Sequence, residues 1–224
     1  RAMIFGLIMH PYLPAGDVFE QPLLSTFDSG SEPIEGRGVR FARVTLGADQ
    51  FPPPADHEGA RILAYGGEYA DSSFEPGVWL GRVDEEERVV TWTGPIHSSD
   101  APEGRADGLW LSTPVKPSMA LAILFGGRSE SGLHNDLWAF SATEEQWKEL
   151  GPSGSEIPSP RAEVALAQRR DSTVAYLFGG VTEEGLSDEL FLLDLVDFDF
   201  ESITASGPTP APRRGASMAL DEEL

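Results

Sequence analysis

A pair of adjacent glycines recurs three times in the chain, each time at the end of a short apolar run. The runs read LAYGG, LFGG and YLFGG, and their glycines are Gly66 and Gly67, Gly126 and Gly127, and Gly179 and Gly180. The second glycines are spaced by 60 and then by 53 residues. Glycine suits the end of a strand where the backbone needs positive φ or where another backbone must come close. The recurrence therefore predicts one small β unit that is repeated along the chain.

The same succession of segments follows each glycine pair. A polar loop leads to a second apolar run and a turn, and an aromatic residue comes 25, 20 and 20 residues after the second glycine. These aromatic residues are Trp92, Trp147 and Phe200. Alternating apolar and polar residues suit a pleated sheet, so each copy is expected to contain successive strands.

The repeated unit resembles the kelch repeat, which has about 50 residues and folds as one four-stranded blade of a β-propeller. It is likewise similar to the repeats of the galactose oxidase central domain. The resemblance covers most of the chain and implies an all-β fold with about four blades of four antiparallel strands. It also implies structural roles for the six repeat glycines and for Trp92, Trp147 and Phe200, with the aromatic rings packed between blades.

Length and composition agree with a single propeller domain over residues 1–224. The 224 residues include 24 glycines and 18 prolines, which fits many short strands joined by turns. The expected blades cover about residues 55–94, 102–151 and 159–206, and a degenerate copy covers residues 1–46. In that copy the expected strands are residues 2–9 in the diglycine position, residues 22–27 in the middle and residues 40–46 on the outside.

The blade over residues 55–94 is short at its start. Between Pro54 and Gly67 there is room for hardly more than one strand, whereas two are needed before a diglycine. Either this blade lacks an ordered first strand, or residues are missing from the chain there.

Residues 210–224 match the sequence from Pro160-Arg161 onward and are expected to begin a further or closing blade. If residues 213–220 pair with residues 2–9, the chain closes as a ring of four blades. The alternative is an open arc of the same blades, either cut from a longer chain or lacking disordered segments, whose edges are covered by another protein or by further residues of the same chain.

Charge and composition narrow the class of partner. The net charge is −21, from 37 acidic and 16 basic residues, which argues against nucleic acid and against an anionic membrane surface. An acidic surface favours solubility and leaves a basic protein partner or a calcium-rich setting as alternatives. The longest apolar run, residues 2–9, is too short to span a membrane and is expected to be a strand. The sequence shows no credible signal peptide or transmembrane segment, so it predicts no particular localisation.

No cofactor, metal site or catalytic residue is expected. The chain has no cysteine, which excludes a thiolate metal site, a Cys nucleophile and the Cys–Tyr cofactor of the galactose oxidase family. Its four histidines are scattered without zinc-ligand spacing. Glu184 and Asp188 match the first two ligands of the E-x3-D-x3-H iron motif of plant specifier proteins, but Leu192 stands at the third position.

The leading functional hypothesis is a non-catalytic protein–protein interaction or scaffold module that serves as a subunit or domain of a larger protein or assembly. Propellers present rigidly held loops, and the loops after the diglycines differ most between copies. Candidate partner-facing residues in these loops are Glu68, Tyr69, Arg128, His134, Glu183 and Glu184. The alternative is a propeller enzyme or carbohydrate-binding protein with its site on the central axis. Asn135-Asp136 and Ser187-Asp188, which precede strands, are predicted to cap turns with their side chains.

Overall fold

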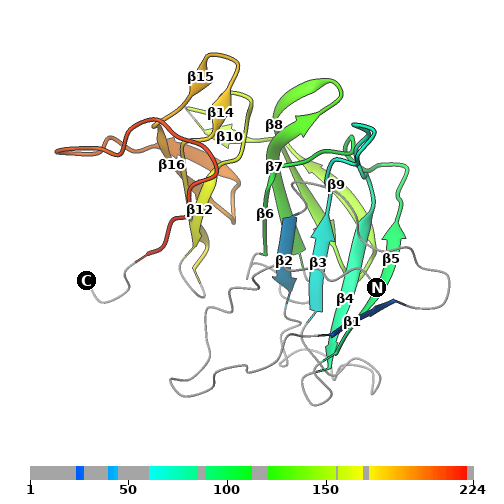
Figure 1. Ribbon diagram of the computed structural model, residues 1–224. Helices are drawn as coiled ribbons and strands as arrows, with labels where there is room; N and C mark the ends of the chain where they lie inside the picture. The colour runs from blue at the N-terminus through cyan, green and yellow to red at the C-terminus, as the bar shows by residue number, and fades with distance from the viewer. Residues whose placement is uncertain are drawn as a thin grey trace.

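All regular elements in the described part of the chain are β-strands. The computed structural model describes residues 24–27, 40–44, 61–84, 89–112, 121–154, 156–168 and 172–220. Strands β1 to β17 form four sheets (Figure 1), which confirms the predicted all-β fold. The residues that the structure describes contain no helix that could traverse a lipid bilayer.

Three of the sheets contain a four-stranded antiparallel unit, here called blades A, B and C. Blade A consists of β2 (Arg40–Val44), β3 (Arg61–Tyr65), β4 (Val78–Asp84) and β5 (Val89–Ile96). Blade B consists of β6 (Leu109–Ser112), β7 (Leu121–Ser129), β8 (Gly132–Ser141) and β9 (Gln146–Leu150). Blade C consists of β12 (Ala165–Gln168), β13 (Val174–Phe178), β16 (Leu190–Asp194) and β17 (Asp199–Ser202). Each blade is a simple meander from its first strand to its fourth, as expected for a kelch-type propeller.

Five short strands complete the sheets. β1 (Leu24–Phe27) runs parallel to β5, and β10 (Ser153–Gly154) runs parallel to β17. Each of these two strands precedes a blade in the sequence and adds to the fourth strand of that blade, so they occupy equivalent positions. A separate small sheet contains β11 (Arg161–Ala162), β14 (Val181–Thr182) and β15 (Gly185–Leu186).

The strand pairing corrects the expected blade over residues 1–46. Arg40–Val44 is not the outer strand of a separate first blade, because it pairs along its length with β3 and is the first strand of blade A. Leu24–Phe27 is likewise not a middle strand, because it lies at the outer edge of blade A beside β5. Blade A therefore has an ordered first strand, supplied from before Pro54. The expected strand over residues 2–9, and with it the ring closure, lies outside the described residues.

Aromatic side chains fill the two interfaces between blades. At the interface of blades A and B, the ring of Tyr65 lies 5.5 Å from that of Trp110 and 5.0 Å from that of Trp147. At the interface of blades B and C, the rings of Phe125 and Phe200 are 4.9 Å apart. All five side chains are buried, so aromatic stacking and apolar burial hold neighbouring blades together.

The fourth strand of each blade carries the repeated aromatic residue. Trp92 is 4% exposed and Trp147 is 6% exposed, which confirms their predicted burial. Trp92 packs with Ala64, Trp79 and Val90 on the side of blade A that faces away from blade B. The repeat therefore places one aromatic ring on the same side of each blade.

The second glycine of the repeat follows the second strand in blades A and C. In blade B the predicted strand end at Gly127 is wrong, because β7 continues to Ser129 after a register shift between Phe125 and Gly127. This irregularity lets the hairpin of β7 and β8 extend beyond the body of the blade, with Gly127 opposite His134.

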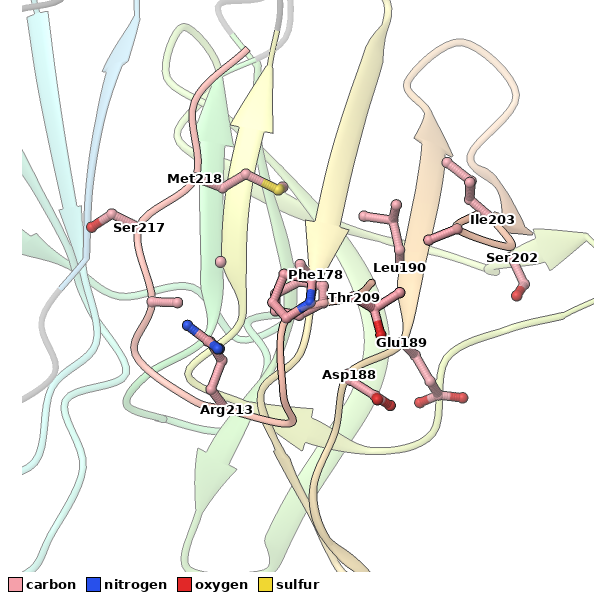
Figure 2. Close-up of a pocket in the computed structure, with 14 residues that line it drawn as sticks. Phe178, Asp188, Glu189, Leu190, Ser202, Ile203, Thr209, Arg213, Ser217 and Met218 are labelled. Carbon is pink, nitrogen blue, oxygen red and sulfur yellow. The ribbon is translucent and has the colours of Figure 1, made fainter. Parts of the chain in front are cut away.

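Beyond blade C, the chain from Ile203 to Met218 folds back against the blade and lines one side of an open cavity of about 480 Å³ (Figure 2). Phe178, Leu190 and Met218 line this cavity. Residues 203–220 contain no strand, so the further blade expected from residue 210 onward is not formed within the described chain.

Candidate functional site

The loops that follow the second strands and the connections that enter the next blade lie at one end of the sheets (Figure 1). This end, here called the loop face, contains residues 66–77, 97–108, 126–136, 158–163 and 179–189. Backbone hydrogen bonds join loops that are far apart in the sequence. Gly67 N donates to Arg105 O at 3.0 Å, and Ala106 and Arg128 exchange two backbone bonds at 2.8 and 2.9 Å.

The glycine pairs allow the backbone of the next connection to come close. Gly66, Gly126 and Gly179 have φ of +72°, +63° and +70°. A Cβ atom would lie 2.7 Å from Arg161 O at Gly126, 2.5 Å from Arg213 O at Gly179 and closer still to Arg105 O at Gly66. Both the backbone angle and the space therefore require glycine at the first position.

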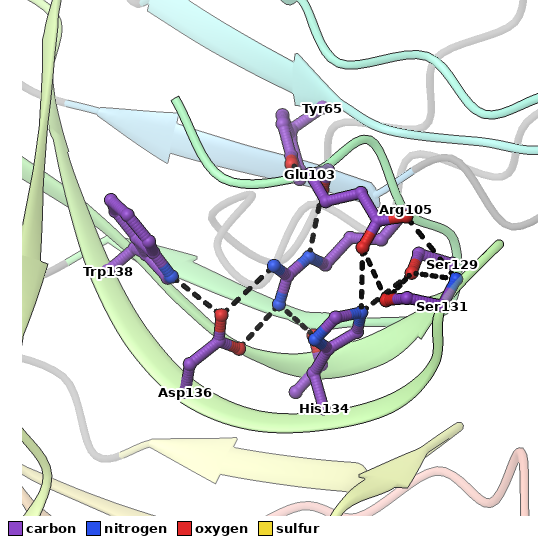
Figure 3. Close-up of polar contacts among 9 residues, drawn as sticks. Tyr65, Glu103, Arg105, Ser129, Ser131, His134, Asp136 and Trp138 are labelled. Atoms are coloured by element: carbon purple, nitrogen blue, oxygen red, sulfur yellow. Dashed lines mark hydrogen bonds and ion pairs between the residues drawn. The ribbon is translucent and has the colours of Figure 1, made fainter. Parts of the chain in front are cut away.

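Arg105 ties the connection between blades A and B to blade B through its buried guanidinium (Figure 3). It donates to the two carboxylate oxygens of Asp136 at 2.5 and 3.0 Å, to Gly126 O at 3.2 Å and to Glu103 O at 3.1 Å. Its exposed fraction is 2%. Burial acts to raise the pKa of Asp136, but the hydrogen bonds and charge of Arg105 outweigh it and hold that pKa below the usual value. The pair is therefore charged, and it holds the blade connection against the β7–β8 hairpin.

Arg161 makes the same arrangement one blade later. Its guanidinium is 1% exposed and donates to Gly179 O at 3.2 Å and to Glu189 Oε2 at 2.7 Å. It also lies over the ring of Phe191 at 5.1 Å. The hydrogen bond from Arg161 lowers the pKa of Glu189. Arg105 and Arg161 are thus equivalent residues, each bonded to a carboxylate nine residues after the second glycine of its own blade.

These arginines and their carboxylates were not among the expected site residues. The signal available in the sequence was an arginine that precedes the first glycine of the pair. Arg105 lies 21 residues before Gly126, and Arg161 lies 18 residues before Gly179. The predicted turn cap at Asp136 is wrong, because this carboxylate binds Arg105 and Trp138 Nε1 instead. The predicted cap at Ser187 is confirmed, since its Oγ accepts from Glu189 N at 3.1 Å.

Two of the expected site residues, Arg128 and Glu68, form an ion pair on the loop face. Arg128 donates to Glu68 Oε2 at 2.7 Å and to Asp107 Oδ2 at 3.0 Å, and its guanidinium lies over the ring of Phe74 at 5.6 Å. The hydrogen bond that Arg128 donates to Glu68 raises the pKa of Arg128. The side chain is 32% exposed, so one edge of this ion-pair group faces solvent.

His134 lies in a second polar group on the same face (Figure 3). Its Nε2 is 2.7 Å from Ser129 Oγ and 3.7 Å from Glu103 Oε2, and Glu103 also accepts from Ser131 Oγ at 2.5 Å. Burial and the nearby charge of Arg105 lower the pKa of His134. The group connects the tip of the β7–β8 hairpin to the connection between blades A and B.

The remaining expected residues lie apart from these two groups. Tyr69 donates its hydroxyl to Glu75, whose other oxygen accepts from Gly77 N at 2.6 Å, so this tyrosine is held within its own loop. Glu183 and Glu184 are exposed in the turn between β14 and β15 of the separate small sheet. Among the described residues, no three histidine or carboxylate side chains are grouped so that they could bind a metal ion.

Comparison with known proteins assigns the family. The sequence profile of the KLHDC2/KLHL20/DRC7 Kelch-repeats domain matches residues 49–223. The chain belongs to the kelch-repeat family. This kelch chain is 26% identical over 226 residues to host cell factor homolog hcf-1 of Caenorhabditis elegans, which covers 88% of the chain and 26% of that protein.

Two plant proteins match shorter parts of the kelch chain. Acyl-CoA-binding domain-containing protein 5 of Arabidopsis thaliana is 32% identical over 102 residues, covering 45% of this chain and 15% of its own length. N-(sulfonatooxy)prop-2-enimidothioate sulfolyase of Thlaspi arvense is 25% identical over 157 residues, which cover 66% of this chain and 41% of that protein. The chain therefore spans less than half the length of each of these relatives.

Proposed function

We propose that this kelch chain is a protein–protein interaction module that binds its partner through the loop face. In this proposal it acts as a scaffold, as a domain or subunit within a larger protein or assembly. The greater length of its relatives supports that role. Kelch repeats generally serve as interaction modules, which supports the class of function but does not identify the partner.

The observation that carries the proposal is the way the loops are held. Arg105 and Arg161 are buried and bonded, and each ties a connection to a hairpin. Loops fixed in this way lose little conformational entropy when a partner binds, so more of the contact energy contributes to affinity. The interior bonds repeat between blades, whereas the residues at the loop tips differ and are free to specify one partner.

The charge of the exposed loop tips favours a partner with basic residues. Glu183 and Glu184 are exposed on the loop face, and Glu103 has a side chain that is 42% exposed. A basic partner surface would gain attraction to these carboxylates and to the overall charge of −21. Nucleic acid is disfavoured by the same charge.

The test uses the absence of cysteine in the chain. A single cysteine is placed at Glu184 on the loop face or at Glu144 in the turn between β8 and β9 at the other end of the sheets. Each variant carries a photo-crosslinker and is exposed to native extract. We expect a defined protein to crosslink from position 184 and not from position 144.

Binding of that purified protein is then measured by calorimetry. The double variant Glu183→Lys, Glu184→Lys is expected to bind at least about tenfold more weakly, since a reversed charge meets a basic surface. The matched double variant Glu144→Lys, Glu145→Lys is expected to bind as the wild type does. Equal crosslinking from both ends, or equal weakening by both double variants, contradicts binding through the loop face.

A further inference from the structure

Ser159 lies beside the buried guanidinium of Arg161, on the connection that enters blade C. Its Oγ accepts a hydrogen bond from Arg161 Nη2 at 2.9 Å, and its backbone O accepts from Arg161 Nε at the same distance. Glu189 Oε2 accepts from the same Nη2 at 2.7 Å. The hydroxyl of Ser159 and the carboxylate of Glu189 are therefore neighbours on one nitrogen.

The sequence around Ser159 suits a protein kinase that requires proline after the serine. It reads Pro158-Ser159-Pro160, and Ser159 is exposed in a segment without regular secondary structure. A following proline favours an extended backbone at the residue before it. The chain has two other such pairs, Thr113-Pro114 and Thr209-Pro210. Of the two hydroxyls that the structure describes, that of Ser159 is the one bonded to an arginine.

The equivalent residue of the preceding connection is acidic. Glu103 stands two residues before Arg105, as Ser159 stands two residues before Arg161, and the backbone O of each accepts from Nε of its arginine. The carboxylate of Glu103 accepts from Ser131 N at 3.3 Å, and its side chain is 42% exposed. This position of the loop face therefore accommodates a negative charge.

The partner of that charge differs between the two repeats. Ser131 and Glu184 each stand four residues after the second glycine of their repeat. In blade B the carboxylate is on the connection and the hydroxyl is at the hairpin tip, whereas the later repeat has these two groups exchanged. By this correspondence, a negative charge added to Ser159 meets a carboxylate at Glu184 in addition to that of Glu189.

We propose that Ser159 is phosphorylated by a proline-directed protein kinase and that its phosphoryl group replaces Glu189 on Arg161 Nη2. In the transfer, Ser159 Oγ attacks the γ-phosphorus of ATP and forms the new O–P bond. The bond from that phosphorus to the oxygen of ADP breaks, and the hydroxyl proton passes to the kinase. This proposal concerns a modification and does not depend on the proposed function.

The charges decide which group keeps the guanidinium. A phosphoserine carries a charge of about −2 at pH 7 and three strong acceptor oxygens. It is attached two residues from Arg161, whereas the Glu189 side chain is 54% exposed and turns into water at little cost. Arg161 keeps its bond to Gly179 O at 3.2 Å. Phosphorylation thus replaces a link between two loops by a bond within the connection, and it adds negative charge to the loop face.

The first test asks whether the folded chain is a substrate. Thr113→Ala and Thr209→Ala leave Ser159 as the one hydroxyl before a proline. This variant is incubated with ATP and a cyclin-dependent or a mitogen-activated protein kinase, in parallel with a peptide of residues 153–167, and the phosphate is located by mass spectrometry. We expect phosphate on Ser159 in both, and none in the chain that also carries Ser159→Ala. Modification of the peptide alone, or of neither, overturns the proposal.

The second test asks whether the phosphoryl group bonds Arg161. The second pKa of phosphoserine is about 6, and a bonded guanidinium lowers it because it favours the dianion. Phosphorus NMR titration is expected to give a pKa in the folded chain at least about 0.5 below that of the phosphorylated peptide. An equal or higher pKa in the folded chain overturns the proposal.

The third test asks whether Glu189 has lost the arginine. In the unmodified chain, Glu189→Gln is expected to lower the folding equilibrium constant about fivefold, and in the phosphorylated chain less than about twofold. Glu144→Gln, at the other end of the sheets, is the matched control and is expected to have equal effects in the two forms. Equal effects of Glu189→Gln in the two forms overturn the exchange of partners.

Discussion

Replacing Arg105 with methionine tests whether the buried arginines stabilise the fold by holding each blade connection against the blade that follows it. The substitution keeps an apolar stem and removes four hydrogen bonds, two to Asp136 and one each to Gly126 O and Glu103 O. Breaking a buried ion pair by removing one partner costs about 3 to 5 kcal/mol. Asp136 is 28% exposed and regains some hydration, so we place the loss near the lower limit, at about 3 kcal/mol.

Arg213→Met is the matched control for this substitution. Arg213 occupies the equivalent position in the repeat, but its side chain is exposed, and among the described residues its guanidinium donates only to Ala211 O. Its replacement is expected to change the free energy of unfolding by less than about 0.5 kcal/mol. The measurement is urea unfolding at pH 7, followed by tryptophan fluorescence and by far-UV circular dichroism.

The pH dependence separates the ion pair from simple packing. The folded-state pKa of Asp136 is lowered, so its contribution to stability is complete above its ordinary pKa of 3.8 and is lost as pH falls through the folded value. The difference between wild type and Arg105→Met should therefore be constant from pH 5 to 7 and shrink below about pH 3.8. A loss below about 1 kcal/mol at pH 7, or an equal loss for Arg213→Met, refutes the argument.

Three further predictions follow from the packing and the polar groups. Trp147→Ala removes ring contacts such as that with Tyr65 at 5.0 Å and should cost about 3 to 5 kcal/mol in urea unfolding; a loss below about 1 kcal/mol would contradict its role in the core. Gly126→Ala places a Cβ 2.7 Å from a carbonyl at φ of +63° and should cost about 1 to 3 kcal/mol or more. Gly151→Ala meets nothing within 4 Å and should cost less than about 0.5 kcal/mol, so equal losses would exclude the steric explanation. For His134, the folded pKa lies below the usual 6.5, so the unfolded chain takes up the proton first and wild-type stability should fall as pH drops below about 6.5. His134→Gln should flatten that dependence between pH 7.5 and 5.5, and an unchanged slope would show that other groups cause it.

Features that depend on local sequence were predicted correctly. The glycine pairs, the strands that precede them and the burial of Trp92 and Trp147 all follow from short-range patterns. An apolar run that ends in two glycines indicates a strand followed by a bend with positive φ, because glycine readily adopts positive φ and most other residues do not. The family and the all-β fold follow from the repetition of that pattern.

Strand pairing and side-chain partners were decided only in the tertiary structure. Arg40–Val44 reads equally well as the last strand of one blade or the first of the next, and the choice depends on its pairing with β3 rather than on its own residues. Arg105 meets Asp136 across 31 residues, and Arg128 meets Glu68 across 60. A charged residue in a loop shows no periodicity, so its partner appears only when packed blades bring the two loops together. The repeat determined which segments become strands, while contacts between blades determined which side chains remain exposed on the loop face.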